Sequence, residues 1–385
     1  MSREVRRVRP YPNRRSEKKA PYVDILMLFC VFLLIVFGLL MLYSVTAYKS
    51  GFGEVKGQVF ATILGVGVMI VTARFFNTRN RYYIGAAALI GAASIFVLIT
   101  PLGMELNGAR RWFKLFGVSV QSAEIVKITL ILLIADRISK DRDYLGKGQN
   151  WLRIMALVGG YTGILGVISS NLSSAIIIVL ICGVMIFVAD RKYTKYIGIV
   201  AIGAIAVVLL VVFVKNGIID LGFRGGRIKM WLDPENNVSG VDSFQTVHGL
   251  YAIGSGGFFG KGIGEGLQKM KLPEAQNDMV FAVLCEELGL IGAIVVILLF
   301  VMLITRLLIL ATRVESYRDK LIVAGVFAHI ALQAVLNIAV VTNTIPNTGV
   351  SLPFISSGGS SVLCLLFEIG LVLNVTKGLN NGEEE

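Results

Sequence analysis

Residues 22–46 read YVDILMLFCVFLLIVFGLLMLYSVT, an apolar run with a single acidic side chain, Asp24. A transmembrane helix needs about 20 apolar residues, so this stretch is long enough to cross a bilayer. A basic stretch precedes it, as in a signal peptide, but the run is too long for one and has no small-residue cleavage site. We therefore interpret residues 22–46 as a retained first membrane span.

The rest of the chain has a similar composition. Of its 385 residues, 55% are hydrophobic and 16% are charged, and the mean hydropathy is +0.74; soluble domains have roughly 25% charged residues. This excludes a soluble globular protein, and long unbroken apolar runs exclude the short alternating strands of a β-barrel. The predicted fold class is an all-α polytopic membrane protein. The four cysteines fall inside apolar runs without CxxC spacing, so we interpret them as core residues.

Nine further apolar segments follow the first. The ten predicted spans cover residues 22–46, 57–76, 82–101, 122–136, 153–170, 173–190, 194–214, 279–305, 320–342 and 358–376. An even number of spans places both termini on the same side of the membrane. The predicted organisation is a basic tail, a single membrane domain with a large outer loop between spans seven and eight, and a second tail, with bounds 1–21, 22–376 (outer loop 215–278) and 377–385.

The distribution of basic residues predicts which segments face the cytoplasm and which face the outside. If the N-terminus is cytoplasmic, the inner segments carry 24 of the 37 basic residues, the outer segments carry 12, and Lys127 lies within a span. Positive charge concentrates on the cytoplasmic side of membrane proteins, so both termini are predicted to be cytoplasmic. The net charge of +12 is then explained by topology, and no nucleic-acid partner is predicted.

Two outer loops nevertheless hold positive charge. Residues 102–121 include Arg110, Arg111 and the aromatic Trp112, and the long loop 215–278 contains seven basic residues. A loop of that length inside a compact domain is usually functional. The two loops favour an anionic substrate at the outer surface; binding of anionic lipid headgroups is the alternative.

An ionisable pair opens the fourth span. Glu124 and Lys127 are three residues apart, on one face of a helix, where they can form an ion pair. One interpretation is a structural pair that holds the bundle together. The other is that Lys127, with Arg110 and Arg111 nearby, binds a pyrophosphate, for which the guanidinium fork of arginine is well suited.

Within the long outer loop, Phe244, Val247 and Leu250 recur at helical spacing and predict an amphipathic helix at the interface. His248 on that helix is interpreted as a structural residue. Seven glycines follow in residues 254–266, in a pattern that matches neither a Walker A motif nor a dinucleotide fingerprint. A hinge is the preferred interpretation, and a loop whose amides approach a phosphate is the alternative.

Asp278 lies where the long outer loop enters an apolar span. At such a place its pKa can be raised toward that of a useful general base; an N-cap is the alternative. Glu286 and Glu287 lie further along the same span and Glu368 lies in the last span, so each of them requires a partner or a polar cavity.

A segment broken by proline and glycine, residues 345–361, opens the last span. Irregular backbone at this depth is tolerated where it is buried in protein or lines a cavity. The helix start, with free amides and hydroxyls, favours an anion; a tight entry turn is the alternative.

Together these residues resemble the SEDS family of bacterial cell-wall proteins, the FtsW, RodA and SpoVE group. The resemblance covers nearly the whole chain, and the motifs that carry it occur in order at residues 38–44, 108–112, 121–127, 227–234, the glycine-rich stretch, 272–278, 286–289 and 346–361. Several neighbours depart from the family pattern, namely Ser122, Ala123, Gln276 and Asn277, as do residues 169–173 and 357–359. The basic tail and the C-terminal motif favour the division branch over the elongation branch.

The resemblance implies a glycosyltransferase that polymerises lipid II with inversion, beside a class B penicillin-binding protein that supplies transpeptidation. Asp278 falls at the position of the family's essential carboxylate and is the predicted catalytic residue. The predicted substrate-binding residues are Arg110, Arg111, Trp112, Glu124, Lys127, Arg227, Gln245, Ser356, Ser357 and Ser360. No cofactor is specified; a divalent cation stays open, although no carboxylate cluster marks a site. A lipid II flippase is the alternative function.

Overall fold

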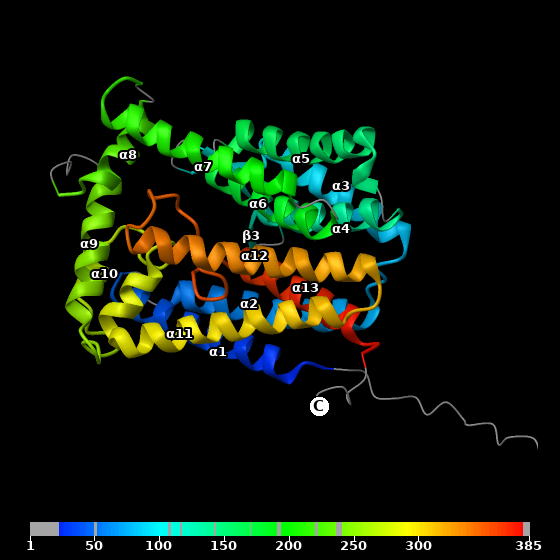
Figure 1. Ribbon diagram of the computed structural model, residues 1–385. Helices are drawn as coiled ribbons and strands as arrows, with labels where there is room; N and C mark the ends of the chain where they lie inside the picture. The colour runs from blue at the N-terminus through cyan, green and yellow to red at the C-terminus, as the bar shows by residue number, and fades with distance from the viewer. Residues whose placement is uncertain are drawn as a thin grey trace, which may run out of the picture.

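The computed structural model describes residues 23–49, 52–106, 109–115, 118–141, 144–169, 171–190, 194–219, 222–235 and 241–379. The terminal tails predicted from the sequence lie mostly outside these ranges. The elements within them (Figure 1) are α1 Ile25–Lys49, α2 Gly53–Phe75, α3 Arg81–Val97, β1 Gly103–Leu106, β2 Ala109–Leu115, β3 Val118–Gln121, α4 Ser122–Ser139, the 3₁₀ turn η1 Tyr144–Gly146, α5 Gly148–Ser169, α6 Leu172–Ala189, α7 Thr194–Lys215, α8 Phe223–Leu232, α9 Val241–Gly256, α10 Gln268–Lys271, α11 Val280–Arg313, α12 Tyr317–Val341 and α13 Gly359–Thr376.

Eight helices in the described part of the chain are long and apolar enough to cross a membrane, namely α1, α2, α5, α6, α7, α11, α12 and α13. Two other helices complete the bundle. α3 has only 17 residues, and α4 carries both acidic and basic side chains but is buried along most of its length. The all-helical polytopic fold class is therefore confirmed.

α11 is longer than its predicted span, which ended at residue 305. It continues to Arg313, because Leu303, Leu307 and Leu310 keep one face of the helix buried at the spacing of an amphipathic helix. On another face, Arg306 Nε donates to the Asp24 carboxylate at 2.7 Å. The charged end of this helix thus packs against the start of α1 instead of entering solvent.

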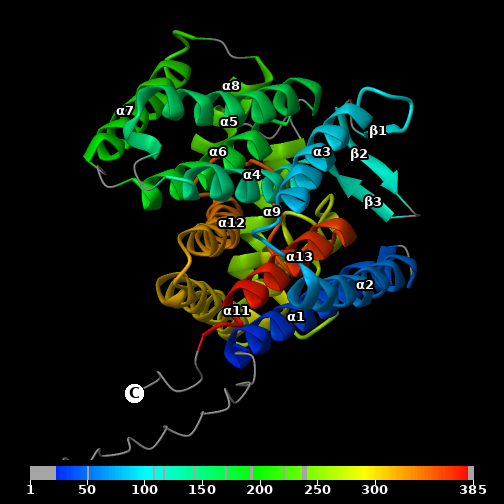
Figure 2. The same ribbon diagram turned by 90° about the vertical axis from the view of Figure 1, so that its right-hand side faces the viewer.

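The short connection 102–121 is a small antiparallel sheet rather than the predicted loop. β2 pairs with β1 on one side and with β3 on the other, so that Trp112 lies opposite Met104 and Gln121. Strands of four residues are too short to show a clear alternation in the sequence. Figure 2 shows the sheet beside α3.

Two hydrophobic cores share one helix. The first joins α1, α11 and α13, and the second joins α3, α4, α5 and α6. α12 contributes Val323 and Val326 to the first core and Leu321 and Ile322 to the second. It therefore lies between the two halves of the bundle (Figure 2). All four cysteines are free and buried, and Cys30, Cys182 and Cys285 belong to these cores, as the sequence predicted.

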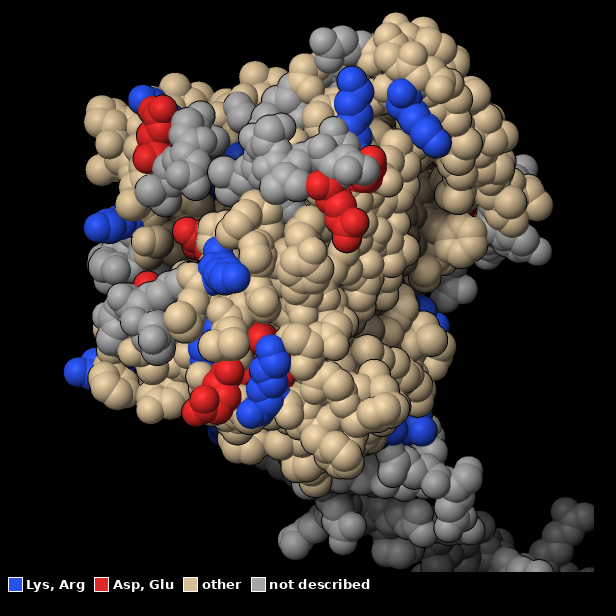
Figure 3. Space-filling view, turned by 90° about the vertical axis from the view of Figure 1, so that its left-hand side faces the viewer, with Lys and Arg blue, Asp and Glu red and all other residues tan. Residues whose placement is uncertain are grey.

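α9 lies across one end of the bundle, at a steep angle to the spans (Figure 1). It buries Gln245 and Ala252 while Phe244 and Tyr251 stay exposed, so the predicted helix has a buried and an exposed face; its position at the membrane interface stays a prediction. Figure 3 shows this end of the molecule, where lysine, arginine, aspartate and glutamate side chains are scattered over a mostly uncharged surface.

Candidate active site

Asp278 lies two residues before the start of α11, at the end of the bundle that α9 covers. Its carboxylate Oδ1 accepts a hydrogen bond from Gln245 Nε2 at 3.0 Å, and its backbone carbonyl accepts one from Asn337 Nδ2 at 2.8 Å. The N-cap position of α11 belongs to Met279, which makes no side-chain cap. The geometry therefore favours a positioned carboxylate over the N-cap alternative.

Gln245 connects Asp278 to two loops. Its Nε2 lies 3.4 Å from the Pro273 carbonyl oxygen as well as donating to Asp278, and its Oε1 accepts from Asn347 Nδ2 at 3.3 Å. The side chain is buried. Both ends of the amide are thus engaged within the protein, which orients the Asp278 carboxylate. Direct substrate contact by Gln245 stays a prediction.

The segment before α13 packs onto the chain that carries Asp278. Ser356 Oγ donates to the Asn277 carbonyl at 2.6 Å, and the Ser357 amide donates to the Gln276 carbonyl at 2.8 Å. These hydrogen bonds are expected if residues 345–361 form a tight entry turn into the last span, the alternative to an anion site at the helix start. Ser360 Oγ is buried without a hydrogen-bond partner, so it differs from Ser356 in having its hydroxyl uncommitted.

Two arginines from distant parts of the sequence influence each other electrostatically. Arg111 lies on β2 and donates from Nε to the Ser169 carbonyl at 3.2 Å. Burial, and next the positive charge of Arg227 on α8, lower the pKa of the Arg111 guanidinium. An anion placed between the two guanidinium groups would relieve their repulsion. This part of the site suits a phosphate or diphosphate.

Arg110 has a different environment from Arg111. Met104 pairs with Trp112 and Glu105 pairs with Arg110, so Arg111 is the extra residue of a bulge in β2. Arg110 lies about half-exposed, with its Nε 3.5 Å from the Glu105 carboxylate, and Trp112 is partly buried in the same strand. Substrate contact by Arg110 and Trp112 stays a prediction.

Lys127 belongs to a buried chain of four ionisable side chains. Its Nζ lies 2.7 Å from Glu124 Oε1 and 2.8 Å from His329 Nε2, and His329 Nδ1 lies 2.8 Å from Glu368. The structural ion pair is thus present, and Glu368 has the partner that its place in a span requires. The contact between Lys127 and a pyrophosphate stays a prediction.

A polar cavity of about 40 Å³ opens beside this chain. Glu124 and Lys127 line one side, and the first turn of α6 and Gln333 of α12 line the others. Gly349 forms part of the wall, and a Cβ added there would lie 3.7 Å from Asp278 Oδ2. Gly349 therefore lies between the cavity and the Asp278 carboxylate.

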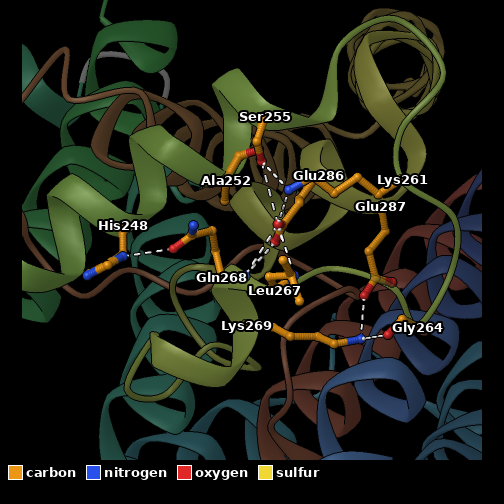
Figure 4. A network of polar contacts seen from close by, with 10 residues as sticks. All are labelled: His248, Ala252, Ser255, Lys261, Gly264, Leu267, Gln268, Lys269, Glu286 and Glu287. Atoms are coloured by element: carbon orange, nitrogen blue, oxygen red, sulfur yellow. Dashed lines mark hydrogen bonds and ion pairs between the residues drawn. The ribbon is translucent and has the colours of Figure 1, made fainter.

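Glu286 and Glu287 hold the loop that precedes α11 onto that helix (Figure 4). Glu286 accepts from Lys261 Nζ at 2.8 Å and Glu287 from Lys269 Nζ at 2.7 Å. His248 Nδ1 lies 2.7 Å from Gln268 Oε1 at the edge of this network, which agrees with a structural role. Both buried carboxylates therefore have the partners that the sequence required.

The glycine-rich stretch docks into a break in α11. The helix is interrupted at Gly289, and the amides of Lys261 and Gly262 donate to the carbonyls of Glu286 and Glu287 at 3.0 Å each. A Cβ on Gly260 would collide with the Glu287 carbonyl. Since the backbone is packed and its amides are used internally, the structure supports neither a free hinge nor a phosphate cradle here.

Asn337 and His329 are the important residues that the sequence reasoning missed. Both lie on α12 and are fully buried, and a polar side chain inside an apolar span was the signal that identifies them. Among the residues that the structure describes, no group of three His, Cys, Asp or Glu side chains forms a metal site. The divalent cation left open by the sequence therefore has no ligand set in this part of the chain.

The helical bundle, with a carboxylate, paired arginines and a polar cavity at one end, defines a polytopic membrane protein with a polar site at one membrane surface. The family model FTSW_RODA_SPOVE, described as cell cycle protein, matches residues 24–381. The chain belongs to this FtsW/RodA/SpoVE family.

Individual relatives match over nearly their whole length. "Probable peptidoglycan glycosyltransferase FtsW" of Trichlorobacter lovleyi is 33% identical over 375 residues, covering 95% of this chain and 96% of that protein. "Stage V sporulation protein E" of Bacillus subtilis is 33% identical over 384 residues, covering 94% and 98%.

Two solved structures share the fold. One, described as "Structural coordination of polymerization and crosslinking by a peptidoglycan synthase complex", has a TM-score of 0.74 at 26% identity and covers 92% of this chain and 97% of that one. The Rod shape determining protein RodA of Thermus thermophilus has a TM-score of 0.66 at 25% identity and covers 93% and 98%.

Proposed function

We propose that this chain is a peptidoglycan glycosyltransferase that polymerises lipid II at the outer face of the cytoplasmic membrane. The observation that carries the proposal is the Asp278 carboxylate, held by Gln245 beside a polar cavity at the end of the bundle. The family membership and the names of the FtsW relatives support the same activity. No observation favours the flippase alternative.

In this mechanism Asp278 removes the proton from the acceptor sugar hydroxyl. The acceptor oxygen attacks the anomeric carbon of the lipid-linked donor, and the bond from that carbon to the diphosphate breaks with inversion. Arg111 and Arg227 stabilise the negative charge that develops on the departing polyprenyl diphosphate. Lys127, Glu124 and Ser360 are available to contact the substrate from the cavity side and from the start of α13.

Purified protein incubated with lipid II tests the activity directly. Glycan strands resolved on a gel are the expected product, and addition of a class B penicillin-binding protein is expected to yield crosslinked strands. That partner is proposed because the similar solved structure is described as coordinating polymerization and crosslinking. Lipid II that stays unpolymerised in both reactions would contradict the proposal.

The paired arginines give a first prediction. Arg111→Gln and Arg227→Gln are each expected to lower polymerisation by about 10- to 100-fold, because a hydrogen bond to a charged group contributes roughly 1.5–3 kcal/mol. Arg110→Gln is the matched control, since Arg110 is about half-exposed and pairs with Glu105. An equal loss in Arg110→Gln would contradict a diphosphate site formed by Arg111 and Arg227 alone.

The proposed orientation, with both termini cytoplasmic, gives a second prediction. Glu235 and Glu315 are both exposed and lie at opposite ends of the bundle, and the native cysteines are buried. In intact cells, Glu235→Cys is expected to react with a membrane-impermeant thiol reagent and Glu315→Cys is expected to be protected. The reverse pattern would invert the topology.

A further inference from the structure

The polar cavity beside Asp278 contains hydrogen-bond acceptors that the protein does not satisfy. Glu124 Oε2 and Gln333 Oε1 are buried without a hydrogen-bond partner, and both residues line the cavity. A buried acceptor without a donor costs free energy. Since two acceptors face one space, that space is built for a ligand that carries an N–H or O–H group.

The same cavity also offers donors. An ammonium group has three N–H donors, and Lys127 spends two of them on Glu124 and His329. On the other side, Ser173 lies in the first turn of α6, where backbone amides lack partners within the helix; the neighbouring Ser174 amide is already capped by Asn171 Oδ1. A carbonyl oxygen of a ligand would find donors in this part of the wall.

Two apolar side chains, Ile177 and Val350, complete the lining. The volume of about 40 Å³ corresponds to about three water molecules at 10–15 Å³ each. It is too small for a sugar ring, but it matches one substituent. A substituent with an N–H, a carbonyl oxygen and a methyl group would contact the acceptors, the donors and the apolar side chains of the lining, respectively.

We propose that this cavity binds the acetamido arm of an N-acetylated amino sugar. Its N–H donates to Glu124 Oε2 or Gln333 Oε1, its carbonyl accepts from Lys127 or the start of α6, and its methyl packs on Ile177 and Val350. This inference rests on the proposed function in that the sugar is taken to belong to the lipid-linked donor.

The surroundings of the cavity agree with a donor sugar. The acetamido arm of an N-acetylhexosamine is attached to the carbon next to the anomeric carbon, so the reacting centre would lie just outside the cavity. Gly349 separates the cavity from Asp278, and Ser169, which accepts from Arg111, lies two residues before the α6 cap residue Asn171. The base and the diphosphate site thus flank the cavity.

His329 and Glu368 act here as positioning residues. They hold Lys127 from the side away from the cavity, so that its ammonium stays beside Glu124. With that charge in place, Glu124 remains an ionised acceptor for the N–H of the arm. This explains why a chain of four buried ionisable groups ends, at Lys127 and Glu124, beside a cavity that accommodates an uncharged substituent.

Two soluble tetrasaccharides test the proposal without requiring catalysis. Chitotetraose and cellotetraose have the same linkage and differ in the acetamido group that chitotetraose carries on each ring. Binding to the full-length protein in detergent is measured as the rise in melting temperature with sugar concentration, using a dye that reacts with the buried cysteines when the protein unfolds. Chitotetraose is expected to bind at least tenfold more tightly than cellotetraose.

Gln333→Met removes one of the two acceptors at nearly constant volume and is expected to lower the affinity ratio, since only Glu124 Oε2 then remains for the N–H. Gln149→Leu is the control, because Gln149 is exposed at the start of α5 and should keep the wild-type ratio. If Gln333→Met does not fold, Ser351→Leu fills the rim of the cavity and is expected to have the same effect.

Equal binding of the two sugars by the wild-type protein, or no binding of either, would overturn the proposal. So would an unchanged affinity ratio in the folded cavity variants. The outcome for the proposed function is separate. If the protein polymerises lipid II but does not discriminate the two sugars, the proposed activity is supported and the proposed acetamido site is contradicted. If it discriminates the sugars but does not polymerise lipid II, the acetamido site is supported and the proposed activity is contradicted.

Discussion

Asp278→Asn is expected to abolish glycan-strand synthesis while leaving an abundant, folded protein. Asparagine keeps the shape of the side chain and can still interact with Gln245, but it cannot accept the proton of the acceptor hydroxyl. Loss of a general base lowers the rate by about 10²- to 10⁴-fold. The measurement is the initial rate of lipid II polymerisation, normalised to protein that elutes as a single species in detergent.

Asn277→Asp with Asp278→Asn is a useful companion, because it moves the carboxylate by one residue while keeping the net charge. Asn277 lies beside Glu274 and away from Gln245, with its Nδ2 donating to the Glu274 carboxylate at 2.7 Å. The pair of substitutions is expected to stay inactive. Nearly normal polymerisation by Asp278→Asn alone would show that a different residue acts as the base.

Lys269→Met is expected to cause the largest loss of stability. Lys269 and Glu287 form an ion pair at 2.7 Å with side-chain exposures of 2% and 0%, and Lys269 also donates to Ser44 and the Gly264 carbonyl. Removing one partner of a buried pair leaves an uncompensated charge and costs about 3–5 kcal/mol. We expect the melting temperature to fall by roughly 5–10 °C.

Two further variants show whether the uncompensated charge is the cause. Lys269→Met combined with Glu287→Gln removes that charge and is expected to recover most of the lost stability. Lys271→Met, at an exposed position of the same short helix, should change the stability by no more than about 0.5 kcal/mol. If Lys269→Met alone were as stable as the wild type, the buried Glu287 carboxylate would not need Lys269 to compensate its charge.

The spans were predictable because each requires only a local run of apolar residues. α4 was found in spite of Glu124 and Lys127, since the apolar residues that follow them are sufficient. Asp278 was identified for a similar reason: a carboxylate at the boundary between a polar loop and an apolar run is visible in a short window of sequence.

Features that depend on distant pairs were not predictable. The partner of Glu368 is His329, 39 residues away, and the partner of Lys127 is the same histidine, 202 residues away. Likewise, Asn337 supports Asp278 from 59 residues away. Nothing in a single sequence specifies such pairs, because they follow from how α4, α12 and α13 pack.

The glycine-rich stretch shows a related difficulty. Its composition indicates that side chains must be absent, but the reason was a close approach of two backbones rather than mobility or phosphate binding. Only the break at Gly289, 29 residues after Gly260, explains it. A glycine inside an apolar span was the one local sign of that break.

The break in α11 also has a consequence for how the protein is made. A span whose backbone is interrupted has polar groups that cannot be left facing lipid, and here the amides of Leu290 and Ile291 donate to the carbonyls of Gly257 and Phe258. Ribosomes deliver the chain from its N-terminus, so in the proposed orientation the glycine-rich stretch crosses the membrane before α11 is inserted. In that orientation the stretch is in place to complete the helix as it arrives, and moving it after α11 by circular permutation should impair membrane insertion.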